Sequence, residues 1–551
     1  MNICRRPFLL FLFVALIGLI ACNQQVPKSD AIQLKTFNYP VLKGNANNLV
    51  LRIAIENSEN LETVKSIAIN LQETNPKDIR ALRLYFTAQD SLFFKEVEFG
   101  KSMHPKMKIV LNGFQKLKSG LNYFWVAYEL SENADIDSWV SATVDFIQFE
   151  TQKLAPANKS SENKLRTGIA LRNHMDDDVH TYRIPGLTTT NEGTLLGIYD
   201  VRRNSGRDLQ GDMDIGVSRS TDGGETWESM QIALDMKEWG GLPQKFNGVS
   251  DANILVDKNS NTIYIAGLWM HGVINPDGIW EEGLDEVSRL WNHQWRNKGS
   301  QPGLGVKQTS QFLLTKSMDD GKTWGEPMNL TEMCKDPKWW LWAPAPGHGI
   351  TLTDGTLIFP TQGRDENGLP FSNITFSKDG GTTWETSKPA FNNTTECMAI
   401  ELQDGTVMLN ARDNRNRDEK GDENGRAIAT TTNLGETWSE HETSHGALVD
   451  CVCMGSLHRH FYSDKNGDKT SVLLFSNPNS KFQRHKITIK VSFDDGLTWP
   501  ENYWIELDEG RSAGYSCLTS IDENTIGILY EGSQAQMTFQ RIPLQEIING
   551  N

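Results

Sequence analysis

The sequence has little of three things, and each shortage excludes a class of protein. Beyond the first 22 residues, no run is long and apolar enough to span a bilayer, so a polytopic membrane protein is excluded. Basic residues are the minority, with 54 Lys and Arg against 70 Asp and Glu, a net charge of −16. A nucleic-acid partner is therefore not expected, because a phosphate backbone needs a basic surface.

Cysteine is also scarce, with 7 in 551 residues. Cys4 and Cys22 lie in the N-terminal leader. The spacing of the others fits neither a zinc site nor a disulfide framework. These five are Cys334, Cys397, Cys451, Cys453 and Cys517. If Cys451 and Cys453 lie on one strand, they point to the same face, so the simplest interpretation places them in a core.

The N-terminus is typical of an export signal. Arg5 and Arg6 precede an apolar run that ends at Ala21, and Cys22 follows. The segment "LIAC" resembles a bacterial lipoprotein signal, which implies that Cys22 becomes the lipidated first residue of the mature chain. The alternative is an ordinary cleaved signal with a chance cysteine. With Asn23 following the cysteine, analogy with other lipoproteins predicts an outer-membrane anchor, with the periplasmic and surface faces both open.

The length predicts two folded domains. Residues 23–150 contain alternating apolar stretches such as "NLVLRIAIEN" and "LNYFWVAYEL", separated by turn residues, which predict a β-sandwich. This domain is a possible carbohydrate-binding module. Residues 151–164 are polar and aperiodic, so we expect a linker there. Residues 165–551 then form the second domain.

An internal repeat dominates the second domain. The pattern Ser-x-Asp-x-Gly-x-Thr-Trp occurs four times, and a fifth copy has Thr431 and Asn433 in place of Ser and Asp. The Asp of each copy can accept hydrogen bonds from the N–H groups of a tight turn, so these aspartates are expected to stabilise hairpins rather than act in catalysis. The copies end at Trp227, Trp324, Trp384, Trp438 and Trp499.

The spacing of the repeats predicts the architecture. Successive Trp residues are 97, 60, 54 and 61 residues apart. A strand-rich period of roughly 60 residues is typical of propeller blades, and the length of the domain allows about six of them. The long first gap predicts an insertion at residues 270–303. The predicted fold is therefore all-β, a six-bladed β-propeller preceded by a β-sandwich.

These repeats, following the segment "TYRIPGL", resemble the sialidase (neuraminidase) family of six-bladed propellers. The resemblance covers roughly residues 165–545. It implies an exo-α-sialidase, a glycoside hydrolase that cleaves terminal α-linked sialic acid from glycoconjugates with retention of configuration. It implies sialylated glycans as partners, no cofactor and no metal.

The family binds the carboxylate of its substrate with three arginines. Arg183 in "YRIPGL", Arg412 in "LNARDN" and Arg484 in "KFQRHK" match them. Arginine suits this task because its planar, permanently charged fork pairs with a carboxylate in a bidentate manner.

The resemblance also implies the reacting groups. Tyr515 in "SAGYSC" matches the nucleophile, which suits a substrate whose own carboxylate would repel an Asp or Glu nucleophile. Glu396 in "TTECMA" matches the base that activates it, and Glu531 matches the residue that orients the first arginine. Tyr530 and Glu401 are the local competitors of Tyr515 and Glu396.

Asp208 in "SGRDLQGDMDIG" matches the acid/base aspartate, with Asp212 and Asp214 as rivals. Asp214 precedes an apolar run and is expected within a strand. Arg202 and Asp251 resemble residues that contact the region of the sugar's ring hydroxyl groups. Residues 412–426 are expected to form a mostly solvated charged loop.

Two other functions stay open. One is a non-catalytic propeller that binds sialoglycans, and the other is a trans-sialidase or an enzyme that forms an anhydro product. The sequence does not separate hydrolysis from these transfers, because the walls of the acceptor site decide between them.

Overall fold

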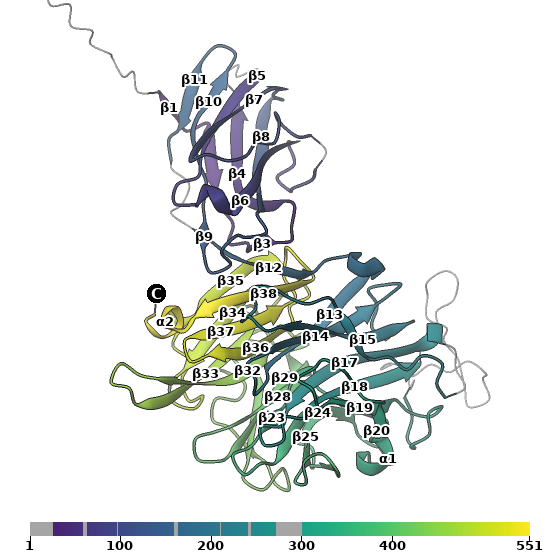
Figure 1. The fold of residues 1–551 in the computed structure, drawn as a ribbon. Coiled ribbons are helices and arrows are strands. Elements are labelled where there is room, and N and C mark those ends of the chain that lie inside the picture. Colours follow the sequence, from purple (N-terminus) through teal and green to yellow (C-terminus); the bar gives the residue numbers. More distant parts are fainter. Residues whose placement is uncertain are drawn as a thin grey trace, which may run out of the picture.

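The structure is a computed structural model that describes residues 26–58, 63–95, 97–158, 164–209, 211–240, 244–271 and 300–550. The predicted leader and most of the predicted insertion at 270–303 lie outside these ranges. The described chain is almost entirely β-structure in two domains, stacked one above the other in Figure 1. No described helix is long and apolar enough to cross a lipid bilayer.

The N-terminal domain contains two sheets that enclose one apolar core. Alternating side chains of β4, such as Leu51 and Ile53, pack against residues such as Ile67 from the other sheet. One sheet has the order β2 (Ile32–Lys35), β4 (Asn48–Asn57), β8 (Gly120–Leu130) and β6 (Ile79–Ala88). The other has the order β1 (Lys28–Ser29), β11 (Lys153–Pro156), β10 (Thr143–Phe149), β5 (Thr63–Asn70) and β7 (Lys108–Lys116).

The sheet that contains β11 extends into the predicted linker. Residues 153–156 pair with β10 and with β1, so they belong to the sandwich. The connection to the second domain is therefore shorter than the sequence predicts, because "KLAP" continues the ladder of its neighbours although its own pattern is too short to show alternation.

The second domain consists of antiparallel sheets arranged as blades. The first three, in chain order, are β13 (Thr181–Thr189), β14 (Leu195–Arg202), β15 (Met213–Ser220) and β16 (Gln231–Leu234); β17 (Asn247–Val256), β18 (Ile263–His271), β19 (Gln311–Ser317) and β20 (Met328–Asn329); and β21 (Leu341–Pro344), β24 (Leu357–Arg364), β25 (Pro370–Ser377) and β26 (Glu385–Thr386). Short strands β22 (Gly347–His348), β23 (Ile350–Thr351) and β27 (Phe391–Asn392) border the third blade.

The last three blades follow the same plan. They are β28 (Thr394–Glu401), β29 (Val407–Asp413), β30 (Ala427–Thr431) and β31 (Ser439–Glu440); β32 (Ser456–Ser463), β33 (Lys469–Pro478), β34 (His485–Ser492) and β35 (Ile505–Arg511); and β36 (Ser516–Asp522), β37 (Thr525–Tyr530), β38 (Met537–Pro543) and β12 (Leu165–Arg172). Helical segments are short: η1 (Pro76–Asp78), η2 (Asp176–Asp178), η3 (Gln244–Phe246), α1 (Thr331–Cys334), η4 (Asn414–Arg417), η5 (Glu501–Tyr503) and α2 (Leu544–Ile548).

The blades contact one another in cyclic order through their innermost strands, β13, β17, β24, β28, β32 and β36. A single parallel pairing between Met213 and Gly248 joins the first two blades into one continuous sheet. In the sixth blade, β12 from the start of the domain pairs antiparallel with β38 from its end. This pairing holds the two ends of the domain together in one sheet.

The N-terminal domain is attached at this same blade. Its strand β3 (Val41–Lys43) pairs parallel with β12, and β9 (Trp139–Val140) pairs with the beginning of β12. In addition, the Asn38 amide donates to the carbonyl of Glu506 at 2.9 Å. The two domains therefore share a backbone ladder, visible at the junction in Figure 1.

The repeated turns have the predicted role. In the first copy, Asp222 accepts the N–H of Thr226 at 3.0 Å, and Ser220 accepts the N–H of Gly224 at 2.8 Å. The divergent copy reproduces the pattern, since Asn433 accepts the N–H of Thr437 at 3.0 Å. Each turn follows the third strand of a blade, so all of them lie at one end of the domain.

Candidate active site

The predicted site residues lie at the opposite end of the blades from the repeated turns. In an antiparallel meander, the beginnings of the first and third strands and the end of the second strand meet at one end. Arg183 begins β13, Arg412 is near the end of β29, and Tyr515 immediately precedes β36. The topology therefore brings side chains from different blades to a common end.

Tyr515 is the centre of this group. Its hydroxyl donates a short hydrogen bond to Glu396 and accepts one from Arg412 Nη1 at 2.9 Å. Burial raises the pKa of Tyr515 well above its ordinary value of 10.0, the charge of Glu396 adds to the rise, and Arg412 and Arg484 oppose it. The phenol is therefore protonated at rest, with its proton already directed at a carboxylate.

Glu396 also binds Arg412, whose Nη1 lies 2.5 Å from Oε2. A β-bulge between Thr394 and Cys397 turns this part of β28, and Glu396 lies within it. The bulge explains how a buried carboxylate in an apolar strand faces the site instead of the core.

Arg183 is held by Glu531, which follows β37. Its Nε donates to Glu531 Oε1 at 2.5 Å, and the same oxygen accepts the N–H of Ile184 at 2.9 Å. Glu531 Oε2 accepts the N–H of Tyr515 at 3.0 Å. Burial raises the pKa of Glu531, but Arg183 and these hydrogen bonds outweigh it, so the pKa is lowered and Glu531 is ionised.

Arg484 is held without a carboxylate. Its Nη1 donates to the carbonyl of Ala513 and its Nη2 to that of Val452, both at 2.9 Å. Val452 has a φ of 64°, a strained value for a β-branched residue. Such strain is found where a backbone group must be aimed at a site.

The guanidinium groups of Arg183 and Arg484 also approach the nucleophile candidate. Their Cζ atoms lie 5.4 and 5.3 Å from the centre of the Tyr515 ring. Together with Arg412 they place three positive charges around one phenol. Arg484 is the member that no described carboxylate neutralises within 4.0 Å. The cluster therefore has capacity for an added anion.

Asp208 lies on the loop after β14, as predicted, with its side chain 65% exposed. Arg202 Nη1 contacts Asp208 Oδ1 at 2.5 Å, and Arg202 Nη2 contacts Asp200 Oδ2 at 2.9 Å. Burial raises the pKa of Asp208, but Arg202 and Arg183 outweigh it and the pKa is lowered. Arg202 is itself 1% exposed, so it supports Asp208 from beneath rather than facing the opening.

Asp251 is buried in β17 at a φ of 54°, next to a bulge between Ser250 and Asn253. Gln362 Nε2 donates to Asp251 Oδ2 at 3.2 Å. Burial raises the pKa of Asp251 well above its ordinary value of 3.8, and Glu396 and other carboxylates add to the rise. Its carboxyl group therefore carries a proton and can donate a hydrogen bond.

The local competitors lie elsewhere. Tyr530 is fully buried, and its hydroxyl donates to Gln540 at 3.0 Å. Glu401 accepts the hydroxyl of Thr353 at 2.9 Å, at the other end of its strand. Asp214 lies in β15, where Arg203 Nε donates to it at 2.9 Å. Asp212 remains near the site, 3.7 Å from Arg203.

Some supporting residues are absent from the sequence-based list. Asp200 holds Arg202 and accepts the hydroxyl of Ser250 at 2.6 Å. It lies two residues before Arg202 on one strand, so the alternation of side chains could have revealed it. Gln362 and the carbonyl of Val452 have no such signal, because distant parts of the chain bring them to the site.

The cysteines and the charged loop differ from expectation in part. Cys451 and Cys453 lie in a loop before β32 rather than on a strand, although Cys453 is buried. In the stretch 412–426, Asn416 and Arg426 are fully buried, and Arg426 pairs with Asp450 at 3.3 Å. Among the described residues, no group of three or more His, Cys, Asp and Glu side chains could hold a metal ion.

The fold and this end of it define a β-propeller with an anion-binding, chemically poised centre. Comparison with known proteins agrees: residues 29–153 match the N-terminal domain of BNR-repeat neuraminidase, and residues 295–528 match a BNR repeat-like domain. A sialidase of Bacteroides fragilis is 40% identical over 570 residues, covering 98% of each chain. The chain therefore belongs to the BNR-repeat neuraminidase, or sialidase, family.

Two further similarities extend this result. A sialidase of Micromonospora viridifaciens is 30% identical over 361 residues, covering 64% of this chain and 50% of that protein. The structure of the Hadza microbial sialidase Hz136 matches with a TM-score of 0.82 and 38% identity. That match covers 93% of this chain and 99% of that one, so both domains share its fold.

Proposed function

We propose that this protein is an exo-α-sialidase that releases terminal α-linked sialic acid with retention of configuration. The observation that carries the proposal is the hydrogen bond from the Tyr515 hydroxyl to Glu396, surrounded by three arginines. A tyrosine paired with a carboxylate is the arrangement of a nucleophile with its base. Membership of the sialidase family supports the substrate class.

The arginines bind the carboxylate on the anomeric carbon of the sugar. Arg183 and Arg412 are held by Glu531 and Glu396, so their orientation is fixed before the ligand arrives. Arg484 is fixed by backbone carbonyls and brings an uncompensated positive charge. This preorganisation spares the complex the entropy of ordering three long side chains.

Asp208 donates the proton to the leaving alcohol. Arg202 and Arg183 hold its pKa down in the free protein. A substrate carboxylate bound by Arg183 adds a negative charge nearby, which raises the pKa of Asp208 and lets it bind the proton it must give. The exposed position of Asp208 suits a group that meets the substrate from the solvent side.

The first step forms a bond between Tyr515 Oη and the anomeric carbon and breaks the bond to the leaving oxygen. Glu396 takes the phenol proton while Asp208 protonates the leaving oxygen. In the second step, Asp208 takes a proton from water, the water oxygen attacks the anomeric carbon, and the phenol recovers its proton from Glu396. Two displacements at one carbon give net retention.

Asp251 and Arg202 line the region expected to meet the ring substituents. The protonated carboxyl of Asp251 suits hydrogen bonding to a hydroxyl group, whereas Arg202 acts through Asp208. The N-terminal sandwich binds glycans or serves as a packing module in this proposal.

We also propose that Cys22 is lipidated and holds the protein at the outer membrane, on the periplasmic or the surface face. The basic pair, apolar run and cysteine of the leader support this. Radiolabelled palmitate should enter the parent and not the Cys22→Ser variant.

Release of free sialic acid from a fluorogenic α-sialoside tests the activity, comparing protein from residue 23 onward with its Tyr515→Phe variant. We expect turnover by the parent and collapse in the variant. A folded parent that binds sialyllactose without turnover would favour a binding propeller. Product analysis by NMR separates hydrolysis with retention from transfer or from an anhydro product.

A further inference from the structure

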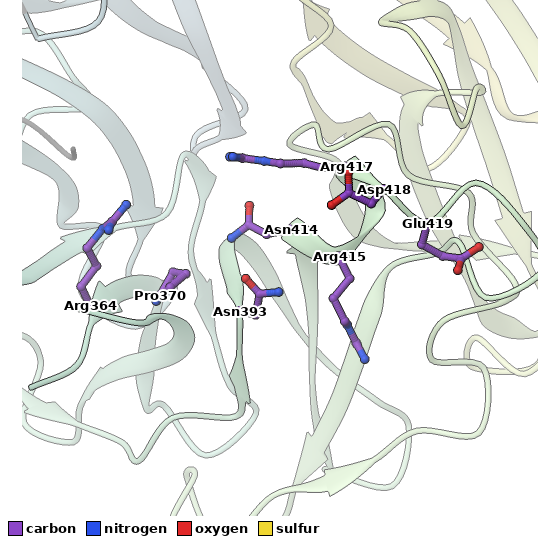
Figure 2. Close-up of a pocket in the computed structure, with 8 residues that line it drawn as sticks. All are labelled: Arg364, Pro370, Asn393, Asn414, Arg415, Arg417, Asp418 and Glu419. Atoms are coloured by element: carbon purple, nitrogen blue, oxygen red, sulfur yellow. The ribbon is translucent and has the colours of Figure 1, made fainter. Parts of the chain in front are cut away.

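A cavity of about 680 Å³ opens between the third and fourth blades. It belongs to none of the groups assigned above. Its lining residues come from the ends of β24, β28 and β29 and from η4, and Figure 2 shows them facing a common space. They are Arg364, Pro370, Asn393, Asn414, Arg415, Arg417, Asp418 and Glu419.

The cavity is continuous in sequence with the reacting centre. Asn393 precedes Glu396 by three residues, and Asn414 follows Arg412 by two. The two asparagines are joined, since the N–H of Asn414 donates to the carbonyl of Asn393 at 3.0 Å. At a rise of about 3.3 Å per residue, they lie roughly 10 Å or less from the Glu396–Arg412 pair. That separation suits the next sugar of a bound glycan.

Two guanidinium groups of the cavity carry uncompensated charge. Neither Arg364 nor Arg417 forms an ion pair with a carboxylate of the described chain. Arg364 Nη1 donates to the carbonyl of Gly368 at 3.3 Å, and its buried Nε has no hydrogen-bond partner there. Burial and the charge of Arg417 both lower the pKa of Arg364, which shows that the two groups repel each other.

The arrangement of these groups favours an anion. Figure 2 shows the guanidinium ends of Arg364 and Arg417 reaching into the same space, with Asn393 and Asn414 below. Like Arg484 in the reacting centre, Arg364 is held by a backbone carbonyl and has no neutralising carboxylate among the described residues. An oxyanion would satisfy the free N–H of Arg364 and relieve the repulsion.

The other charged residues do not cancel this potential. Arg415 is engaged by Asp413, whose Oδ2 lies 3.0 Å from its Nε. Glu419 accepts the N–H of Gly421 and points away from Arg364 in Figure 2. Asp418 is the remaining carboxylate, and it is exposed to solvent beside Arg417. Solvent screens an exposed carboxylate more strongly than it screens a partly buried guanidinium.

We propose that Arg364 and Arg417 form a second anion subsite, which takes an acidic group on the glycan beyond the terminal sialic acid. The inference rests on the proposed function and narrows its substrate class to glycans with more than one acidic group. A second sialic acid offers a carboxylate and a sulfated sugar offers a sulfate ester. Both present the paired oxygens that arginine forks bind.

The test compares three substrates: sialyllactose, an α2,8-disialyl lactose and a sulfated sialyl-lactosamine. The variants are Arg364→Gln with Arg417→Gln together, and Arg80→Gln as a control of equal side-chain change on the N-terminal domain, 65% exposed. Removing two partly exposed charges should lower kcat/KM on the doubly acidic substrates by about fivefold or more, and leave sialyllactose within about twofold. Added salt should shrink the difference.

A loss on the disialyl substrate alone identifies a carboxylate subsite, and a loss on the sulfated substrate alone identifies a sulfate subsite. Equal losses on all three substrates, or no loss on either acidic one, would overturn the proposal. Thermal melting of each variant checks the fold. Calorimetric binding of the same three glycans to the Tyr515→Phe background tests the subsite even if the parent shows no turnover, which is the separate failure of the proposed function.

Discussion

Glu531 Oε2 accepts the backbone N–H of Tyr515 at 3.0 Å, while Oε1 of the same carboxylate accepts Nε of Arg183. One buried carboxylate therefore fixes both the first arginine and the backbone of the proposed nucleophile. It is connected to the centre twice, and this makes its charge the most economical place to disturb the site without touching a reacting atom.

Replacing Glu531 by Gln keeps its shape and removes its charge. Because a buried arginine then loses its ion-pair partner, we expect a loss of about 1–3 kcal/mol in the free energy of unfolding and a rise in KM. Denaturant melts and steady-state kinetics measure the two effects. Glu401→Gln, on an exposed contact with Thr353, is the matched control. Identical behaviour of the two variants would remove Glu531 from the positioning role.

Asp208→Asn separates the two chemical roles of that carboxylate. Without a proton donor, cleavage of a poor leaving group such as a sugar alcohol should fall by about 10²–10⁴-fold. A phenol with a low pKa needs less protonation, so turnover of a fluorogenic sialoside should fall less. The ratio of kcat/KM values on the two substrates is the readout.

Asp212→Asn is the control for this prediction, since Asp212 lies near the site but contacts Arg203 and Gln244 instead. If Asp212→Asn produced the leaving-group dependence and Asp208→Asn did not, the acid would be Asp212.

Asp251 makes stability depend on pH. Burial, Glu396, Asp200 and Asp208 raise its pKa far above 3.8, with Arg202 opposing, so the folded protein holds a proton that the unfolded chain releases. The stabilisation is complete below pH 3.8 and is lost as the pH rises toward the folded-state pKa. Asp251→Asn should therefore flatten the fall of unfolding free energy with pH, by up to about 1.4 kcal/mol per unit.

Denaturant unfolding at a series of pH values above 3.8 measures this slope. Asp178→Asn in the exposed loop after β12 provides the control and should leave the slope unchanged. A parent and an Asp251→Asn variant with parallel profiles would show that Asp251 is ionised in the folded protein.

Gly514 precedes Tyr515 with a φ of +89°, and an added Cβ would lie 3.0 Å from Pro478 and 3.1 Å from Arg484. Gly514→Ala should therefore move Arg484 and Tyr515 and lower kcat/KM by at least about tenfold, beyond the strain of about 1–2 kcal/mol that a left-handed alanine carries. Kinetics and thermal melts measure both quantities.

Gly467 isolates the strain from the displacement. It has a φ of +86° and nothing within 4 Å of an added Cβ. Gly467→Ala should cost similar stability and leave kcat/KM unchanged. Equal kinetic losses in the two alanine variants would attribute the effect to backbone strain rather than to crowding of Arg484.

The sequence by itself determined the class of fold. Alternation in stretches such as "NLVLRIAIEN" predicted the sandwich, since every second side chain must enter a core. The repeated turns, from Asp222 to Asp494, predicted the blades because their hydrogen bonds are local, each closing within a few residues. Resemblance to the sialidase family then indicated Arg183, Tyr515 and their partners.

Only the tertiary structure decided which groups touch. The Tyr515–Glu396 hydrogen bond joins residues 119 positions apart, and Arg183 and Glu531 are 348 apart. No local pattern encodes such distances, since they arise from the cyclic packing of the blades. The supporting contacts of Val452, Asp200 and Gln362 come from strained backbone, buried charge and neighbouring blades, and the same packing places Arg364 opposite Arg417.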